Sequence, residues 1–216
     1  DLLQAETDAG RRRELAQTIQ SSALRAVGVV KQLLGFARGR EGEKTLVQPR
    51  HLIGEVVGIA RETFTRSITV EQACSPDLWP VLANGNQLHQ VLLNLCLNAR
   101  DAMPAGGRLT LRATNVVLDE CYAAMHQEAT PGSHVQIEVS DTGTGIPEAV
   151  QARLFESFFT TKGEDQGTGL GLTTSRGIVR DHGGFITFTS VPGRGTTFRV
   201  HLPAQPDTLD LARSAS

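Results

Sequence analysis

Apolar residues recur at steps of four and three in the first part of the chain. Between residues 11 and 38 the positions of this repeat are Leu15, Ile19, Ser22, Ala26, Val29, Leu33 and Phe36, of which only Ser22 is polar. This is the a/d repeat of a packed helical seam. A single amphipathic helix of this length cannot bury its stripe alone. The pattern therefore predicts a long helix that pairs with another helix or another subunit; the alternative is a helix folded back on its own domain.

Beyond Pro49 the pattern changes repeatedly between a helical period and a period of two. Helices are predicted at 51–64, 87–103 and 169–181, and strands at 67–73, from 109, at 134–140, 185–190 and 197–202. This order predicts a two-layer α/β sandwich, with a mixed, largely antiparallel sheet and helices on one face. We expect a helical hairpin segment over 1–46, a globular domain over 47–203, and a linker or disordered tail over 204–216.

Composition excludes several function classes. The net charge of −2 gives no basic excess for binding nucleic acid. The three cysteines are far apart and lack a C-x-x-C pair, so we interpret them as reduced thiols rather than a disulfide framework or a metal site. No apolar run approaches the roughly 20 residues that cross a bilayer. We expect this portion to be cytoplasmic, with membrane attachment only through a possible upstream segment.

A polar stripe runs along the predicted helix at 87–103. Gln90, Asn94, Asn98 and Asp101 follow one another at steps of four, four and three. Asparagine is a poor residue in the middle of a helix, because its amide competes with the backbone. One interpretation is that an asparagine oxygen completes the coordination of a Mg²⁺ ion already held by phosphate oxygens. The alternative is a capped or solvated polar face.

Asp141 ends an alternating strand and is followed by Gly143, Gly145 and Ile146. Glycines at a strand end let the backbone approach a flat ligand closely. A carboxylate there can accept a hydrogen bond from the exocyclic amine of adenine, whereas the carbonyl of guanine offers it no proton to share. The alternative is an Asx turn between two strands.

A second glycine run, Gly167-Thr-Gly-Leu-Gly171, precedes a predicted helix. Unpaired N–H groups and the positive end of the helix dipole favour phosphate at such a place. The run lacks the Lys-Ser or Lys-Thr of a Walker loop, and a plain hinge is the alternative.

The stretch 148–166 before this run is interpreted as a lid, with Phe155, Phe158 and Phe159 docking when ordered and Lys162 reaching phosphate. Core packing of the phenylalanines and a solvated lysine are the alternatives. Gly193-Arg-Gly-Thr-Thr197 suits a hairpin turn, and it is also expected to place the Thr197 hydroxyl beside Asp141.

Taken in order, these motifs resemble the boxes of a known family. Residues 89–103 resemble its asparagine box, and 141–145, 155–162, 167–172 and 193–198 resemble its remaining boxes. From about residue 50 to 202 the chain resembles the catalytic, ATP-binding domain of sensor histidine kinases of two-component systems, within the gyrase, chaperone, histidine kinase and mismatch-repair ATPase superfamily. The helix at 11–38 is similar to the second helix of the family's dimerisation and histidine-phosphotransfer hairpin.

The resemblance implies a protein-histidine kinase that uses ATP and Mg²⁺, forms a homodimer through the N-terminal helix, and passes phosphate to a response regulator receiver domain. It implies catalytic roles for Asn94, Asn98 and Lys162, with Asn98 as the magnesium ligand and Asp141 on adenine. The implied nucleotide contacts are Asn98, Asp141, Gly143, Gly145, Ile146, Phe158, Thr160, Thr161, Lys162, Gly167, Thr168, Gly169, Leu170, Gly171, Leu172 and Thr197.

The sequence departs from the family pattern at three places. Thr142 replaces a commoner asparagine, which we expect to be tolerated, and Asp101 stands where many relatives carry a basic residue. The family's phosphoacceptor is a histidine followed by an acidic residue, and none of the six histidines here has an acidic residue after it. We therefore expect the phosphoacceptor to lie upstream of Asp1.

Two other functions stay open. An ATP-hydrolysing clamp of the same superfamily carries a glutamate four residues before the magnesium asparagine, where this chain has Asn94. A non-catalytic nucleotide-sensing module that serves in dimerisation is the third possibility.

Overall fold

The computed structural model describes residues 11, 43–126, 128–160 and 169–206. By its internal contacts the chain divides into two compact units, residues 1–42 and 43–216. The helix predicted at 11–38 lies outside the described residues apart from Arg11, so its pairing stays a prediction. Among the described residues, no helix is both long and apolar enough to span a bilayer.

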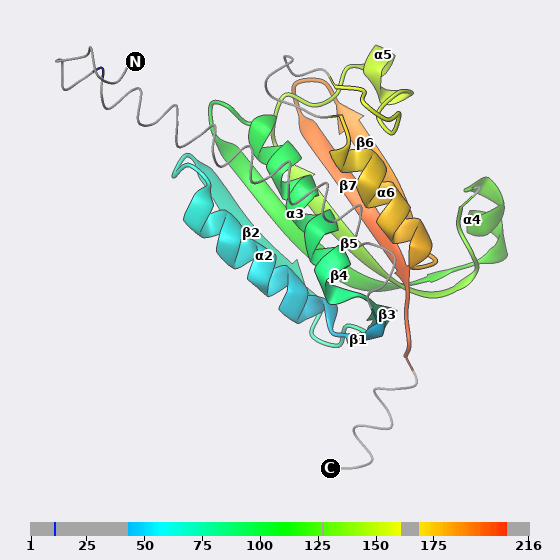
Figure 1. The fold of residues 1–216 in the computed structure, drawn as a ribbon. Helices are drawn as coiled ribbons and strands as arrows, with labels where there is room; N and C mark the ends of the chain where they lie inside the picture. Colours follow the sequence, from blue (N-terminus) through cyan, green and yellow to red (C-terminus); the bar gives the residue numbers. More distant parts are fainter. Residues whose placement is uncertain (1–10, 12–42, 127, 161–168, 207–216) are drawn as a thin grey trace, which may run out of the picture. The chain divides into compact units, whose positions relative to one another are not determined.

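A five-stranded mixed sheet forms the centre of the second unit (Figure 1). Its strand order is β2 (Ile68–Cys74), β4 (Gly107–Leu118), β5 (Gly132–Asp141), β7 (Gly195–Pro203) and β6 (Phe185–Val191). The β2–β4 pair is parallel and the other pairs are antiparallel. A separate two-stranded sheet pairs β1 (Thr45–Val47) with β3 (Val81–Ala83). The prediction of a mixed, largely antiparallel sheet is confirmed.

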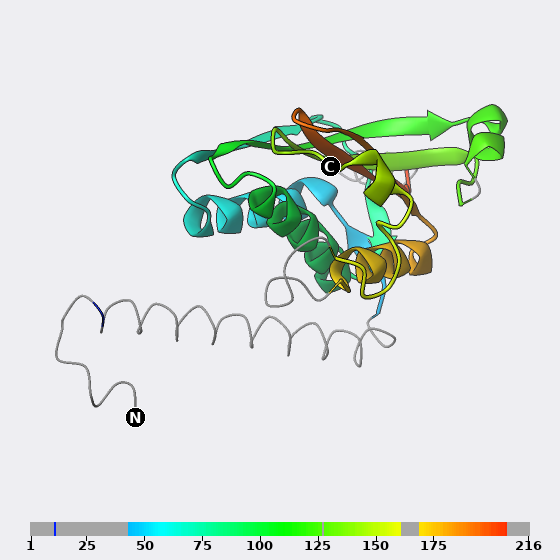
Figure 2. The ribbon, with the colours of Figure 1, turned by 90° about the horizontal axis from the view of Figure 1, so that it is seen from above.

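Three helices cover one face of the sheet, as Figure 2 shows from above. They are α2 (Pro49–Thr63), α3 (Gly85–Asp101) and α6 (Gly171–Asp181). Their apolar stripes and the facing side chains of the strands form one continuous buried core. Two short helices lie in connections: α4 (Glu120–Met125) between β4 and β5, and α5 (Glu148–Gln151) after β5. The two-layer arrangement with helices on one face is thus confirmed.

The central helix α3 begins where a capping side chain is available. The Asn84 side-chain oxygen accepts a hydrogen bond from the Gln87 backbone N–H at 3.1 Å, which satisfies one of the orphan donors of the first turn. Leu88, Val91 and Leu95 then lie buried at steps of three and four. This stripe fixes the rotation of α3, so that its polar stripe lies on a different side of the helix.

Strand alternation decides which side chains reach the helix layer. In β5, Val135, Ile137 and Val139 are fully buried in the core. Since successive side chains point to opposite faces, Asp141 shares their helix-covered face. The side chains of Gln136, Glu138 and Ser140 point to the other face of the sheet, called here the outer face.

Candidate functional site

Asp141 lies at the end of β5, with its carboxylate half satisfied. Its side chain is only 7% exposed. One oxygen, Oδ1, accepts hydrogen bonds from the backbone N–H groups of Gly143 at 2.8 Å and Thr196 at 3.3 Å. The second oxygen accepts none from the described residues. Burial raises the pKa of Asp141 above its ordinary value, and the two N–H groups partly offset the rise. The carboxylate is therefore held rigidly, with one oxygen ready for an external donor.

The turn after Asp141 is clamped between α3 and the β6–β7 hairpin. The Thr144 N–H donates to the Ala102 carbonyl just beyond α3 at 2.9 Å, and the Thr144 carbonyl accepts from the Gly193 N–H at 2.7 Å. Gly195 has a φ of 108°, and a Cβ atom added there would collide with the Asp141 carbonyl oxygen. The glycine at this position is thus required by the close approach of β7 to Asp141.

Thr142 and Ile146 complete this turn. The Thr142 hydroxyl accepts a hydrogen bond from the Arg108 N–H at 2.9 Å, so threonine supplies a contact of its own at the position where an asparagine is commoner. The Ile146 N–H donates to the Ser190 hydroxyl at 2.8 Å. Gly145 between them adopts a φ of 67°. These contacts join the ends of β4, β5 and β6 around the carboxylate.

The prediction that the Thr197 hydroxyl lies beside Asp141 is wrong. Thr197 pairs with Ser140 in the β5–β7 register, and their hydroxyls are 2.7 Å apart on the outer face. Its neighbour Thr196 lies on the helix-covered face, where its N–H binds Asp141 and its hydroxyl lies 2.9 Å from that of Ser190. A shift of one residue along a strand reverses the face. Thr196 is therefore the residue that the sequence reasoning missed.

The polar stripe of α3 faces the beginning of α6. The Asn94 side-chain amide donates to the Gly171 carbonyl at 3.4 Å and to the Ser175 hydroxyl at 3.5 Å. Asn98 lies one turn further along α3, towards Ala102 and the Asp141 turn, and its side chain is half-buried. The α3 stripe thus connects the carboxylate end of the site with the N-terminus of α6.

Among the described residues, no side chain at the N-cap position of α6 binds the start of the helix. Its N-cap residue is Leu170, whose apolar side chain cannot bind the N–H groups of the first turn. Leu172 packs against the hydrophobic core and fixes the start of the helix. Such a helix start can bind an anion through its N–H groups and dipole.

The aromatic residues before α6 have different environments. Phe155 packs against the core and contacts the Phe188 ring edge-on at 6.1 Å between centroids. Phe159 lies beneath the Arg153 guanidinium at 4.3 Å. Phe158 is 75% exposed and has a φ of 65°, unusual for a residue with a side chain. Core packing therefore describes Phe155 but not Phe158.

Four expected site residues, Thr161, Lys162, Gly167 and Thr168, lie outside the described residues. Thr160 and Gly169 lie at the two borders of that segment, and both are half-buried. The Phe158 N–H donates to the Gly169 carbonyl at 3.1 Å, which brings these borders together. Asp101 forms an ion pair with its neighbour Arg100 at 2.7 Å.

Comparison with known proteins identifies the class to which this fold and site belong. Residues 83–206 match the family described as histidine kinase-, DNA gyrase B-, and HSP90-like ATPase, so the chain belongs to this family. The matched range contains α3, Asp141 and α6.

Relatives within the family are sensor kinases. The chain is 40% identical, over 86% of its length, to the sensor kinase CckA of Brucella abortus. It is 36% identical, over 88% of its length, to the sensory histidine kinase/phosphatase NtrB of Azospirillum brasilense. It spans 20% and 47% of the lengths of these two relatives.

Solved structures show the same architecture. The catalytic domain of histidine kinase ThkA matches with a TM-score of 0.62 at 29% identity, covering 76% of this chain and 98% of that domain. Full-length ShkA in complex with AMPPNP matches with a TM-score of 0.69 at 26% identity, covering 95% of this chain and 42% of ShkA. The unit described here corresponds to a histidine kinase catalytic domain.

Proposed function

We propose that residues 47–203 form the ATP-binding catalytic domain of a protein-histidine kinase. It would transfer the γ-phosphate of ATP to a histidine upstream of this chain, for relay to an aspartate of a response regulator. The observation that carries the proposal is the buried Asp141 carboxylate, with one oxygen held by two N–H groups and the other open to a donor. Family membership and the names of the sensor kinase relatives support it.

The order of groups along α3 matches the order of groups in a nucleotide. Asp141 would accept from the adenine amine, and the N-terminus of α6 would bind phosphate. Asn94, which contacts Gly171 at the start of α6, is eight residues from Ala102, which contacts the Asp141 turn. Eight residues of helix span about 12 Å. This spacing supports a bound ATP that lies along α3, with its base at Asp141 and its phosphates near Asn94.

Magnesium fits the same arrangement. Within the part of the chain that the structure describes, no group of three or more His, Cys, Asp or Glu side chains could hold a metal. A Mg²⁺ ion here would take most of its oxygens from phosphate and water, and the half-buried amide of Asn98 would add a neutral oxygen. Bound magnesium would neutralise charge on the transferred phosphoryl group. Lys162 would approach the phosphates as a second positive charge.

Partners follow from the proposed activity. Residues 1–46 would form part of a dimerisation hairpin and give a homodimer, and the product phosphohistidine would be read by a receiver domain. The name of the Azospirillum brasilense relative combines kinase with phosphatase. For this chain we propose only the kinase reaction and no phosphatase reaction.

The test is phosphate transfer in trans. The chain is incubated with Mg²⁺, ATP labelled at the γ-phosphate, and a helical hairpin that contains a phosphoacceptor histidine. We expect label on the hairpin that is labile to acid and stable to base, as a phosphoimidazole is. Asn98→Ala should reduce the transfer at least tenfold, whereas Gln90→Ala, a change two turns earlier on the same stripe, should leave it near the wild-type rate.

Two outcomes would replace the proposal. Steady ATP hydrolysis without transfer, abolished by Asn94→Ala, would favour a clamp ATPase. Asn94 is poorly suited to that reaction, because its side-chain amide donates to Gly171 and Ser175 and an amide oxygen is not basic enough to activate water. No ATP binding in calorimetry would favour a non-catalytic module.

A further inference from the structure

A second, smaller cluster lies on the outer face of the sheet, at the end of β5 opposite Asp141. Its aromatic and imidazole rings come from helix α4, from the C-cap residue of α4, and from strands β5, β6 and β7. The Phe185 and His201 rings stack with centroids 4.3 Å apart and planes 6° from parallel. The members are Tyr122, His126, His134, Phe185 and His201. We call this set the histidine cluster.

Helix α4 closes the histidine cluster from outside. Tyr122 projects from α4 and lies 6.3 Å from both Phe185 and His201, measured between ring centroids. His126, the C-cap residue of α4, contacts Tyr122 at 4.4 Å. His134 and His201 are each only 1% exposed. Opening α4 would therefore remove the Tyr122 ring from beside His201, an imidazole that is buried when α4 is closed.

Each of these imidazoles has one nitrogen without a partner. His134 Nδ1 is 3.0 Å from the Gly132 carbonyl, which can only accept, so Nδ1 carries the proton and Nε2 has a lone pair. His201 Nε2 is 2.9 Å from the Gln136 side-chain oxygen, which leaves the lone pair of His201 on Nδ1. Among the described residues, His134 Nε2 and His201 Nδ1 are buried with no hydrogen-bond partner. In its neutral form each ring thus has a buried acceptor that none of the described residues uses.

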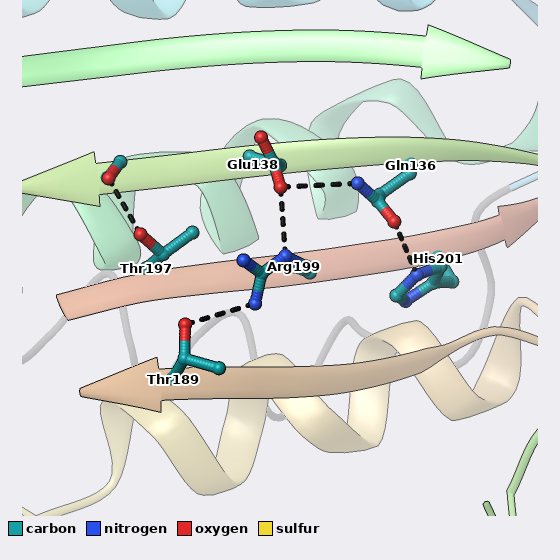
Figure 3. Close-up of polar contacts among 7 residues, drawn as sticks. Gln136, Glu138, Thr189, Thr197, Arg199 and His201 are labelled. Atoms are coloured by element: carbon teal, nitrogen blue, oxygen red, sulfur yellow. Dashed lines mark hydrogen bonds and ion pairs between the residues drawn. The ribbon is translucent and has the colours of Figure 1, made fainter. Parts of the chain in front are cut away.

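Charged groups around His201 do not favour its protonation. Figure 3 shows His201 joined through Gln136 to Glu138, which also pairs with Arg199 at 2.8 Å. The Glu138 carboxylate is therefore already bound by a guanidinium. Burial first, and then His134, Arg199 and His126, lower the pKa of His201 from 6.5 to about 4.

We propose that the histidine cluster is an acid-sensitive latch that holds α4 closed over the outer face while its imidazoles are neutral. A proton on the unused nitrogen of His201 would be a buried donor with no acceptor among the described residues. Protonation therefore favours the open state, in which water solvates the charged ring. The latch is separate from the proposed nucleotide site, which lies at the other end of β5 on the opposite face.

The linkage fixes the direction and size of the effect. His201 has a depressed pKa when closed, so the stability of the closed state is complete above pH 6.5 and is lost as pH falls towards 4. Between pH 7.5 and 5.5 one histidine with these two values increases the open-to-closed ratio about tenfold.

The test is hydrogen exchange of the α4 amides in the whole chain, with rates corrected for intrinsic pH dependence. We expect the protection of α4 to fall about tenfold between pH 7.5 and 5.5, with a smaller change in α3. His201→Phe keeps a ring against Phe185 and cannot titrate, so it should remove most of this fall. His51→Gln, which alters an exposed histidine on α2, is the matched control and should retain it.

Two results would overturn the latch. One is a wild-type α4 whose corrected protection does not change with pH, and the other is an equal fall in His201→Phe and wild type. Should His201→Phe fail to fold, imidazole NMR of the wild-type chain decides the question. A His201 signal that titrates at its ordinary value without any exchange change in α4 would overturn the proposal, and a neutral His201 down to the pH at which α4 opens would support it.

Discussion

The end of β5 and the end of α6 bury a titratable side chain to the same extent but use it differently. Asp141 and His182 are each 7% exposed. Asp141 has one oxygen bound by two N–H groups and one oxygen without a described partner. His182 has both nitrogens bound, with Nδ1 2.7 Å from the Ile178 carbonyl and Nε2 accepting from the Asn84 N–H at 3.0 Å. Burial alone therefore does not distinguish these two groups; they differ in how many of their polar atoms are hydrogen-bonded.

The two groups respond to pH in opposite senses. Burial raises the pKa of Asp141, so the ionised carboxylate makes the fold less stable as pH rises through that value. Burial lowers the pKa of His182, with Lys44 acting in the same direction, so stability is complete above pH 6.5 and declines as pH falls. At neutral pH the buried charge of Asp141 therefore lowers the stability of the fold, as is expected at a binding site. The buried His182 has no such effect at neutral pH.

The largest expected effect comes from neutralising Asp141. Asp141→Asn should weaken ATP binding about 100-fold, because an amide can present a donor to the adenine amine and a buried mismatch costs about 1–3 kcal/mol. Its melting temperature should equal or exceed that of wild type, since the buried charge is gone. Titration calorimetry and thermal unfolding measure the two quantities. Glu62→Gln, on the exposed side of α2, is the control, and ATP affinity preserved in Asp141→Asn would remove the basis of the comparison.

Crowding the same end should have the next largest effect. Gly195→Ala would push β7 away from the Asp141 carbonyl and should destabilise the domain by about 2–4 kcal/mol, from overpacking and from backbone strain. Gly193→Ala is the matched control: its φ is 76°, but nothing lies within 4 Å of an added Cβ. It should cost only about 1 kcal/mol. Urea unfolding of both variants measures this difference, and equal losses would contradict the crowding argument.

Substituting His182 at the end of α6 should lower the stability of the domain without changing its affinity for ATP. His182→Phe fills the space but loses both hydrogen bonds, leaving the Asn84 N–H at the start of α3 without its acceptor. We expect a loss of about 2 kcal/mol in the free energy of unfolding. Part of the stability decline below pH 6.5 should also disappear. Unfolding curves at pH 7.5 and 5.5 measure both effects, and a large fall in ATP affinity would show that this end is not purely structural.

The smallest expected effect on the free energy of unfolding comes from a glycine in the middle of α2. Gly58 lies in the middle of α2, and nothing lies within 4 Å of a Cβ added there. Gly58→Ala should therefore stabilise the domain by about 0.5–1 kcal/mol through helix propensity. ATP affinity should stay at the wild-type value. A destabilised variant in the same unfolding assay would mean that α2 is packed against something outside the described residues.

Periodicity predicted the helices and strands because burial imposes those periods. The helix predicted at 87–103 is α3, Gly85–Asp101, and the strand predicted at 134–140 is β5, Gly132–Asp141. A mixed, largely antiparallel sheet was predicted, but the pair that is parallel was not, because an alternating strand has the same pattern in a parallel or an antiparallel pair; it is the β2–β4 pair.

Site geometry was harder to predict. Thr196 and Thr197 are identical residue types at adjacent positions, and only the β5–β7 register decides which one reaches Asp141. The histidine cluster gave no signal either, because histidines at alternate strand positions look like polar, solvent-facing residues. Their burial depends on α4, a six-residue helix too short to show a reliable period.

The hydrogen bond from Phe158 to Gly169 has a consequence for how related sequences can diverge. It joins two points that are eleven residues apart, and a Cβ at Gly169 would collide with the Phe158 backbone. The entropic penalty of closing a loop grows by only about 0.6 kcal/mol for each doubling of its length. Changes of length between these two residues should therefore alter the stability of the domain only slightly, as long as the two ends of the segment are retained, and their main effect should fall on the nucleotide contacts proposed for Lys162 and Gly167.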